Sequence, residues 1–184
     1  MIYPENFERK IGFNEIRTLL KGRCLSSLGT EWVDKELHFM HDFEQIKQAL
    51  DEAWEYKIFE EQTDEEVETE FFDVREALLR ARPERTFLEE LDLFNLKRSI
   101  ASVLSYAKLF TQKVDDEDLS TTDADTENNR GQIKYLYPAL GKMACDVVVF
   151  PEIIQRIDKI LNKYGKVKDT ASPELLSLRH QIEI

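Results

Sequence analysis

The chain has 184 residues, a net charge of −12 and 42% hydrophobic residues, values that suit a globular protein of one or two domains. No apolar run approaches the ~20 residues that a membrane-spanning helix needs, and the opening MIYPENFERK lacks the apolar stretch of a signal peptide. The two cysteines, Cys24 and Cys145, lie far apart in apolar stretches, which favours buried and reduced thiols. We therefore expect a cytoplasmic protein without a membrane partner.

The negative charge is concentrated in two segments. Residues 60–76 hold nine acidic residues and one basic residue, and residues 114–130 hold seven acidic residues and one basic residue. The rest of the chain has 23 basic and 21 acidic residues, a net charge of +2. Because nucleic acids are bound first through their phosphates, the total charge argues against such a partner, but its distribution leaves the remaining surface nearly neutral.

Three helices are predicted before the first acidic segment. Asn14 is a suitable N-cap for the first, Ser26 or Ser27 for the second and Asp42 for the third. Apolar residues at helical spacing follow each cap, so we expect them to face the core. They are Ile16, Leu19, Leu20 and Cys24, then Leu28, Trp32 and Val33, then Phe43, Ile46, Leu50, Ala53, Trp54 and Ile58.

Two further helices are predicted in the middle of the chain. A short one around 74–81 is expected to end before Pro83, and the longest begins near Leu88. Its apolar residues recur at alternating spacings of three and four, the a/d pattern of a helix packed along another helix. An intramolecular partner suits so short a pattern, although the seam of a coiled-coil dimer fits it as well. These residues are Leu93, Leu96, Ile100, Val103, Ala107 and Phe110.

Residues 114–130 have no apolar periodicity and are rich in Asp, Thr and Asn, so we predict a flexible acidic loop there. A helix is expected over 131–145. Another opens at Pro151 and is closed by Gly165 at its C′ position. The predicted fold class is therefore all-α, an irregular multi-helix bundle of seven or eight helices.

One more helix is predicted at the end of the chain. Ser172 is a good N-cap, Pro173 suits the first helical position, and Glu174 favours the positive end of the helix dipole. The chain stops about three turns later without a C-cap, inside what reads as a longer helix. We therefore expect this sequence to be part of a longer protein.

The sequence lacks the common catalytic and metal-binding motifs. Its six glycines are too scattered for a phosphate-binding loop, and it has no H-E-x-x-H, C-x-x-C or E-x-x-H pattern. His38 and His41 lie one helical turn apart if that stretch is helical, but two ligands are too few for a metal site. We predict no catalytic residue, no cofactor and no metal in this chain.

Two small basic groups are the candidates for contacts with phosphates. Arg75, Arg82 and Arg85 lie in and just after the short helix, and the spacing of seven between the first two would place them on one helix face. The neighbouring acidic residues are the favoured alternative partners for these arginines. Lys166 and Lys168, in NKYGKVKD, form the second group.

Several segments, taken in order, resemble the N-terminal part of the MutS family. They are FERKIGFNEIRTLLKGRCLSSLGTEWV, FFDVREALLRAR, YPALGKMA and FPEIIQRIDKILNKYGKVKDTASPELLSLRHQI. The similarity is to the type-two branch, which lacks the mismatch-reading and connector domains and begins with the helical core. The most specific parts are CLSSLG at 24–29 and DTASPELLSLR at 169–179.

This resemblance implies that residues 1–170 are a MutS-like helical core and that residues 171–184 begin the lever helix. The family places the lever and DNA clamp downstream, followed by an ABC-type ATPase that binds ATP and magnesium and dimerises, and often by an Smr nuclease domain. Full-length relatives bind branched DNA and restrain recombination, and some act on collided ribosomes. The core itself would be a structural coupler between ATPase and clamp in this mismatch-repair-like family.

The chain also departs from the family pattern. The acidic segment 114–130 looks like an insertion, and Arg85 and Thr86 stand in a region where relatives often carry a glycine. A free-standing helical module that binds a partner protein is the alternative function. The MutS resemblance predicts that the reading frame continues past Ile184 to a G-x-x-x-x-G-K-[ST] loop, whereas the alternative predicts a complete fold without it.

Overall fold

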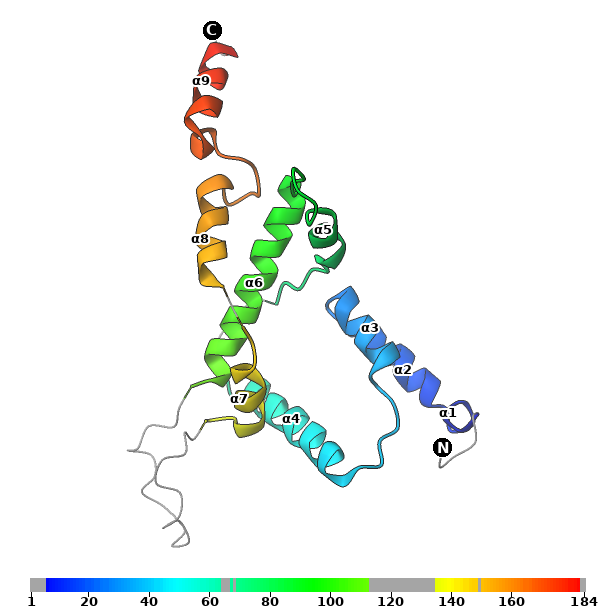
Figure 1. Ribbon diagram of the computed structural model, residues 1–184. Coiled ribbons are helices and arrows are strands. Elements are labelled where there is room, and N and C mark those ends of the chain that lie inside the picture. Colours follow the sequence, from blue (N-terminus) through cyan, green and yellow to red (C-terminus); the bar gives the residue numbers. More distant parts are fainter. Residues whose placement is uncertain (1–5, 64–66, 68, 113–134, 149, 183–184) are drawn as a thin grey trace, which may run out of the picture. The chain divides into compact units, whose positions relative to one another are not determined.

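The computed structural model describes residues 6–63, 67, 69–112, 135–148 and 150–182 (Figure 1). Within these ranges the regular secondary structure is helical, apart from isolated bridge residues such as Leu161 and Val167, which pair with each other. This confirms the predicted all-α class. The predicted loop at 114–130 lies outside the described residues.

The helices follow one another along the chain as labelled in Figure 1. Their bounds are α1 (Phe7–Lys10), α2 (Phe13–Lys21), α3 (Ser27–Lys35), α4 (Phe43–Gln62), α5 (Arg75–Arg80), α6 (Glu90–Phe110), α7 (Pro138–Cys145), α8 (Pro151–Ile160), the 3-10 turn η2 (Asp169–Ala171) and α9 (Pro173–Ile182). Within the described residues, none of these helices is long and apolar enough to cross a membrane.

Three of the predicted N-caps are confirmed. The Ser26 hydroxyl accepts the Gly29 N–H at 3.1 Å, and the Asp42 carboxylate accepts the Gln45 N–H at 2.9 Å. The Ser172 hydroxyl accepts the Leu175 N–H at 3.1 Å, so α9 begins as predicted. Each bond satisfies a first-turn amide that has no partner inside the helix.

The prediction that Asn14 caps a helix was wrong. The helix α2 begins two residues earlier than predicted, after Gly12, whose φ of 77° lies in the left-handed region. Glycine adopts this conformation without the steric cost that other residues pay. The turn between α1 and α2 is therefore made by backbone geometry, and Asn14 lies inside the helix.

Two predicted helix bounds also differ from the structure. The helix expected over 131–145 is α7, which begins only at Pro138, where proline suits the first helical position. The helix α8 ends at Ile160, so Gly165 is not its C′ residue. Gly165 lies instead in the turn closed by the Leu161–Val167 bridge, with a φ of 74°.

The chain forms two compact units, and the division between them falls inside α6. Unit 1 takes Met1–Phe39, Thr69–Ala101 and Pro151–Ile184, and unit 2 takes Met40–Glu68 and Ser102–Phe150. Unit 1 therefore holds α1, α2, α3, α5, the first half of α6, α8, η2 and α9. Unit 2 holds α4, the second half of α6, and α7.

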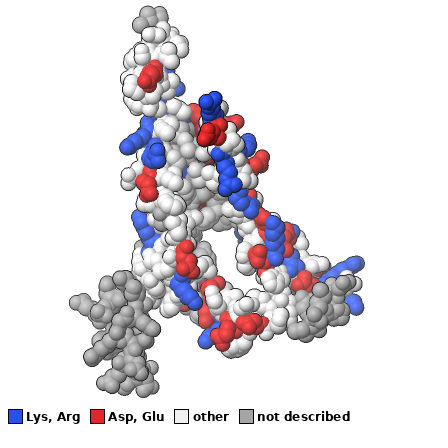
Figure 2. All heavy atoms as spheres, viewed as in Figure 1, with Lys and Arg blue, Asp and Glu red and all other residues white. Residues whose placement is uncertain are grey.

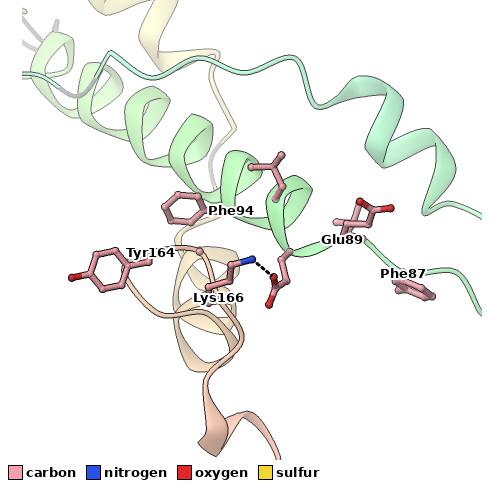
Figure 3. Close-up of a pocket in the computed structure, with 9 residues that line it drawn as sticks. Phe87, Glu89, Phe94, Tyr164 and Lys166 are labelled. Atoms are coloured by element: carbon pink, nitrogen blue, oxygen red, sulfur yellow. Dashed lines mark hydrogen bonds and ion pairs between the residues drawn. The ribbon is translucent and has the colours of Figure 1, made fainter.

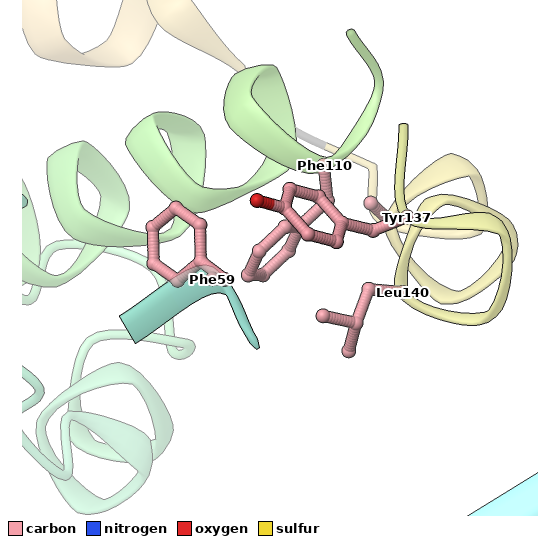
Figure 4. Close-up of a cluster of buried hydrophobic side chains, with 5 residues drawn as sticks. Phe59, Phe110, Tyr137 and Leu140 are labelled. Carbon is pink, nitrogen blue, oxygen red and sulfur yellow. The ribbon is translucent and has the colours of Figure 1, made fainter. Parts of the chain in front are cut away.

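An aromatic cluster forms the core of unit 2 (Figure 4). Phe59 of α4 meets Phe110 of α6 edge to face at 5.2 Å between ring centroids, and meets Tyr137 in the same way at 5.8 Å. Leu140 and Ala144 complete the cluster from α7. Edge-to-face packing of such rings stabilises a core beyond the area that it buries.

Glu55 joins α4 to α7 within unit 2. Its carboxylate accepts the N–H groups of Ala139 at 3.0 Å and Leu140 at 2.9 Å. The side chain of Tyr137, the residue before α7, does not cap this helix. A residue more than 80 positions away in sequence therefore supplies the carboxylate at the positive end of α7.

The a/d pattern of α6 predicted a helix packed along it, and in unit 1 α8 contacts the first half of α6 through the Lys97–Asp158 ion pair at 2.5 Å. A segment without regular secondary structure, residues 69–73, also lies against α6: the Phe72 N–H donates to the Ser99 hydroxyl at 2.8 Å. Arg98 pairs with Glu70 and stacks over the Phe72 ring, 4.7 Å from its centroid. Polar side chains on α6 thus secure a segment without regular structure.

The inward-facing stripes predicted for α2, α3 and α4 are largely exposed. Leu19 is 72% exposed, Trp32 56%, Leu50 65% and Trp54 60%. Val33, in contrast, is buried as predicted, with 5% exposure. The helical period was correct, but a stripe is buried only where another element covers it.

The two cysteines are free thiols. Cys24 is half-buried, whereas Cys145 is exposed, contrary to the expected burial. The Cys145 Sγ lies 2.9 Å from the Tyr135 hydroxyl, and this hydrogen bond raises the pKa of Tyr135.

Candidate functional site

The predicted basic residues Lys166 and Lys168 lie in unit 1, beside an open groove at the start of α6 (Figure 3). The groove has a volume of about 650 Å³. Three of its apolar side chains are strongly exposed: Phe87 at 83%, Leu91 at 66% and Tyr164 at 74%. Its lining residues are Phe87, Leu88, Glu89, Glu90, Leu91, Phe94, Tyr164, Gly165 and Lys166.

Glu90, the first residue of α6, fixes one side of this groove. Its carboxylate accepts the Lys166 Nζ at 2.8 Å and the Val167 N–H at 3.0 Å. These hydrogen bonds, that from Lys166 first, hold the pKa of Glu90 below its usual value, and the charge of Arg179 acts in the same direction. Lys166 is therefore engaged in holding the turn against α6.

Gly165 allows the turn to approach α6 closely. A Cβ at this position would lie 2.8 Å from the Phe94 ring, and the φ of 74° is one that side-chain-bearing residues rarely adopt. Figure 3 shows Phe94 beside the turn that carries Tyr164 and Lys166. Because Gly165 has no side chain, the turn packs directly against Phe94, and both residues line the groove.

A second hollow of about 500 Å³ lies at the base of α9. Arg179 of α9 pairs there with Asp169 of η2, and Lys168 Nζ donates to the Asp158 carbonyl at 2.5 Å. Both candidate lysines line this hollow, and both are held by groups of unit 1. Lys168 and Arg179 therefore link α8, η2 and α9, whereas Lys166 links the turn to α6.

Arg75 is also engaged by carboxylates. It donates to Asp73 from Nε at 2.9 Å and from its second terminal nitrogen at 2.6 Å, and it pairs with Glu31 of α3. This donation holds the pKa of Asp73 at about 2, with a further backbone N–H from Arg75. Arg75 and then Lys35 hold the pKa of Glu31 at about 2. The sequence favoured pairing of these arginines with neighbouring acidic residues, and the Arg75–Asp73 ion pair confirms this for Arg75.

Arg82 does not share a helix face with Arg75, contrary to the prediction. The helix α5 ends at Arg80, which pairs with Asp92 at 2.9 Å, so Arg82 lies beyond it. Arg82 and Arg85 are exposed, and neither makes an ion pair within the described part of the chain. Of the five candidate residues, Arg75, Lys166 and Lys168 are bound by oxygen acceptors of the chain, whereas Arg82 and Arg85 have no ion pair among the described residues.

Arg85 has an unusual backbone conformation. Its φ is 66°, and the Thr86 N–H donates to the Pro83 carbonyl across this turn. A positive φ at the third residue of a turn favours glycine. Arg85 therefore occupies a backbone conformation that is strained for a residue with a side chain.

The charges on the visible face are mixed in sign (Figure 2). Lys and Arg side chains alternate with Asp and Glu, without a broad basic area. A protein that binds the phosphates of a nucleic-acid duplex needs several Lys or Arg side chains that are free to replace the counterions. The arrangement is that of ion-paired connections between helices.

No group of three or more His, Cys, Asp or Glu side chains that suits a metal ion gathers among the described residues. His38 and His41 lie in a non-helical stretch between α3 and α4, so the helical spacing considered for them does not apply. Both histidines are exposed.

Sequence reasoning missed Glu31, Glu55 and Glu90, three carboxylates that join distant segments. Each sits among many other acids, and its partner lies 44 to 85 residues away. A local pattern carries no signal of such a pair. The position of Glu90 in the first turn of a helix was the single available hint.

Comparison with family models gives no match, and comparison with curated proteins gives none either.

Proposed function

We propose that this chain is the N-terminal helical core of a MutS-type DNA-binding ATPase of the type-two branch. In this proposal it acts as a structural coupler between the ATPase and the DNA clamp. The observation that carries the proposal is the last helix, α9, which is fixed at its base and open along its length.

The base of α9 is held by several contacts. Ser172 caps the first turn, the Asp169–Arg179 pair ties the second turn to η2, and η2 is the main packing partner of α9. No residue of Pro173–Ile182 is buried, and Leu178 and Ile182 are 58% and 82% exposed. A helix anchored only at one end suits a lever that transmits movement.

The segments most similar to MutS proteins coincide with these structural joints. DTASPELLSLR, residues 169–179, starts with Asp169 and ends with Arg179, the two partners of the ion pair at the base of α9. CLSSLG, residues 24–29, contains the cap of α3, Ser26, and Gly29, where an added Cβ would lie 3.4 Å from the Cys24 side chain. Both segments therefore have a local structural reason for their composition.

The proposal assigns catalysis to other parts of the protein. The sequence contains no Gly-rich phosphate loop, so ATP and magnesium would bind to the downstream ATPase. Branched DNA or a ribosome would be the target of the full-length protein, as a cytoplasmic homodimer. Possible nuclease activity would belong to an Smr domain.

Fluorescence anisotropy with a labelled four-way DNA junction, followed by a salt titration, tests whether the core is only a coupler. We expect no binding by this chain at low salt, because three of the five candidate cations are engaged. Binding with a steep salt slope that is lost in Arg82→Ala/Arg85→Ala would overturn this part of the proposal. Lys108→Ala, which removes an exposed lysine far from both groups in sequence, is the matched control.

A further inference from the structure

The first turns of α4 carry an apolar stripe that is open to solvent. Phe43, Leu50 and Trp54 are 73%, 65% and 60% exposed, and Ile46 is half-buried between them in sequence. Their spacings of three, four and four place them on one side of the helix. The other end of α4 is fixed by Phe59 in the aromatic core, so the stripe belongs to a well-anchored helix.

A groove with three acidic and two basic side chains lies between α4 and α7, which lie side by side in Figure 1, and its α4 residues are neighbours in sequence of the stripe residues. It has a volume of about 380 Å³, and Glu44 and Asp51 line it from α4. These two residues are seven apart, hence two turns or about 10 Å along one side of the helix. Neither carboxylate makes an ion pair within the described residues, whereas Glu55 beside them is occupied by the α7 amides.

The charge of α4 indicates the kind of partner that fits. Phe43–Gln62 holds six acidic residues and two lysines. Lys57 pairs with Glu61 at 3.6 Å and covers the Trp54 ring at 5.2 Å, while Lys47 and Lys142 line the groove with the acids. A second copy of this chain would bring the same acidic helix and a net charge of −12.

We propose that the stripe Phe43–Trp54 and the α4–α7 groove form a docking surface for a basic amphipathic helix of a partner protein. The apolar side of that helix covers Phe43, Leu50 and Trp54. Two of its Lys or Arg residues, seven apart, pair with Glu44 and Asp51. Helices commonly dock through such an apolar stripe, and exposed Trp and Phe are typical anchors of an interface. This inference stands independently of the coupler function.

The test uses the whole chain and two labelled helical peptides. Both peptides have leucines at a/d positions, and they differ in having either lysines or glutamates at two flanking positions seven apart. We expect anisotropy to show binding of the lysine peptide and about tenfold weaker binding of the glutamate peptide. Leu50→Asp should weaken binding of the lysine peptide by about tenfold or more.

Leu19→Asp is the matched control, because Leu19 is 72% exposed on α2. It should leave binding of the lysine peptide unchanged. The double variant Glu44→Lys/Asp51→Lys alters only exposed charges, and it should reverse the preference in favour of the glutamate peptide.

Three results would overturn the proposal: no binding of the lysine peptide, an equal loss in Leu19→Asp, or an unchanged preference in the charge-reversed variant. Sedimentation velocity tests whether a second copy of this chain, and not a partner protein, occupies the stripe. A dimer of the chain that is lost in Leu50→Asp would assign the stripe to a second copy instead.

Discussion

At Gly165 a single methyl group is expected to disturb the fold. A Cβ there would lie 2.8 Å from Phe94, and the φ of 74° disfavours any side chain. We predict that Gly165→Ala lowers the free energy of unfolding by about 2 kcal/mol, from strain and steric conflict together. Urea unfolding followed by circular dichroism measures this loss.

Gly22→Ala is the control for that change. Gly22 has a φ of −67°, and its nearest neighbours to a new Cβ are backbone oxygens at 3.4 and 3.7 Å. This variant should stay within about 0.5 kcal/mol of the parent. A loss at Gly165 no larger than that at Gly22 would show that the turn does not pack tightly on α6.

The carboxylates around Arg75 give the stability a dependence on pH. The pKa values of Glu31 and Asp73 fall from 4.5 and 3.8 to about 2 in the folded chain. Both carboxylates are thus more acidic when folded, so their contribution is present above the unfolded values and is lost as the pH falls toward about 2. We predict a decline in the free energy of unfolding across this window.

Arg75→Gln should flatten that decline, because it removes the cation that lowers both pKa values. Arg82→Gln, which removes a cation without an ion pair among the described residues, should leave the slope as it is. Denaturation in urea at a series of pH values, at low salt, measures the slopes. Equal slopes in the parent and Arg75→Gln would contradict the assigned pairing.

At the scale of single residues, the sequence predicted what depends on close neighbours. Ser26, Asp42 and Ser172 cap helices as expected, because a cap and its amide lie three residues apart. Gly165 was recognised as a left-handed position but placed at a helix end. Nothing local revealed that Phe94 lies against it.

At the scale of elements, Glu55 is expected to govern the stability of α7. Its carboxylate accepts two amides at the start of that helix, at 3.0 and 2.9 Å. We predict that Glu55→Gln destabilises unit 2 by about 1–2 kcal/mol, because an amide replaces a charged acceptor. Hydrogen exchange of the Ala139 and Leu140 amides should accelerate in this variant.

Glu52→Gln is the comparison for Glu55, since among the residues that the structure describes the Glu52 carboxylate accepts from Gln48 on the same helix. Its effect on the α7 amides should be negligible. Exchange that is equally fast in both variants would mean that Glu55 does not hold α7.

The sequence located the helices better than the surfaces that they bury. The periodicity of α2 and α4 was read correctly, but Leu19, Leu50 and Trp54 are exposed. Amphipathic spacing shows which side of a helix is apolar and does not show whether another element covers it. For α6, the segment 69–73 without regular secondary structure contacts the helix in addition to α8, and the a/d pattern did not indicate that segment.

At the scale of the whole molecule, the all-α class followed from composition and period, whereas the division inside α6 did not. The contacts that define each unit join residues far apart in sequence, such as Glu55 with Leu140 and Glu90 with Val167. The chain has 37 acidic residues, so the sequence alone does not show which of them, such as Glu55 and Glu90, join distant segments. At the candidate site the sequence predicted only the basic residues, and three of these, Arg75, Lys166 and Lys168, are bound by oxygen acceptors within the chain.

The central claim, that this chain is the core of a MutS-type ATPase, is tested most directly by reading the gene beyond the codon for Ile184. We predict that the same reading frame continues through an extended lever helix to a G-x-x-x-x-G-K-[ST] loop, and that its product hydrolyses ATP. A stop codon directly after Ile184, with the chain stable and monodisperse as it stands, would contradict the claim and favour a free-standing interaction module.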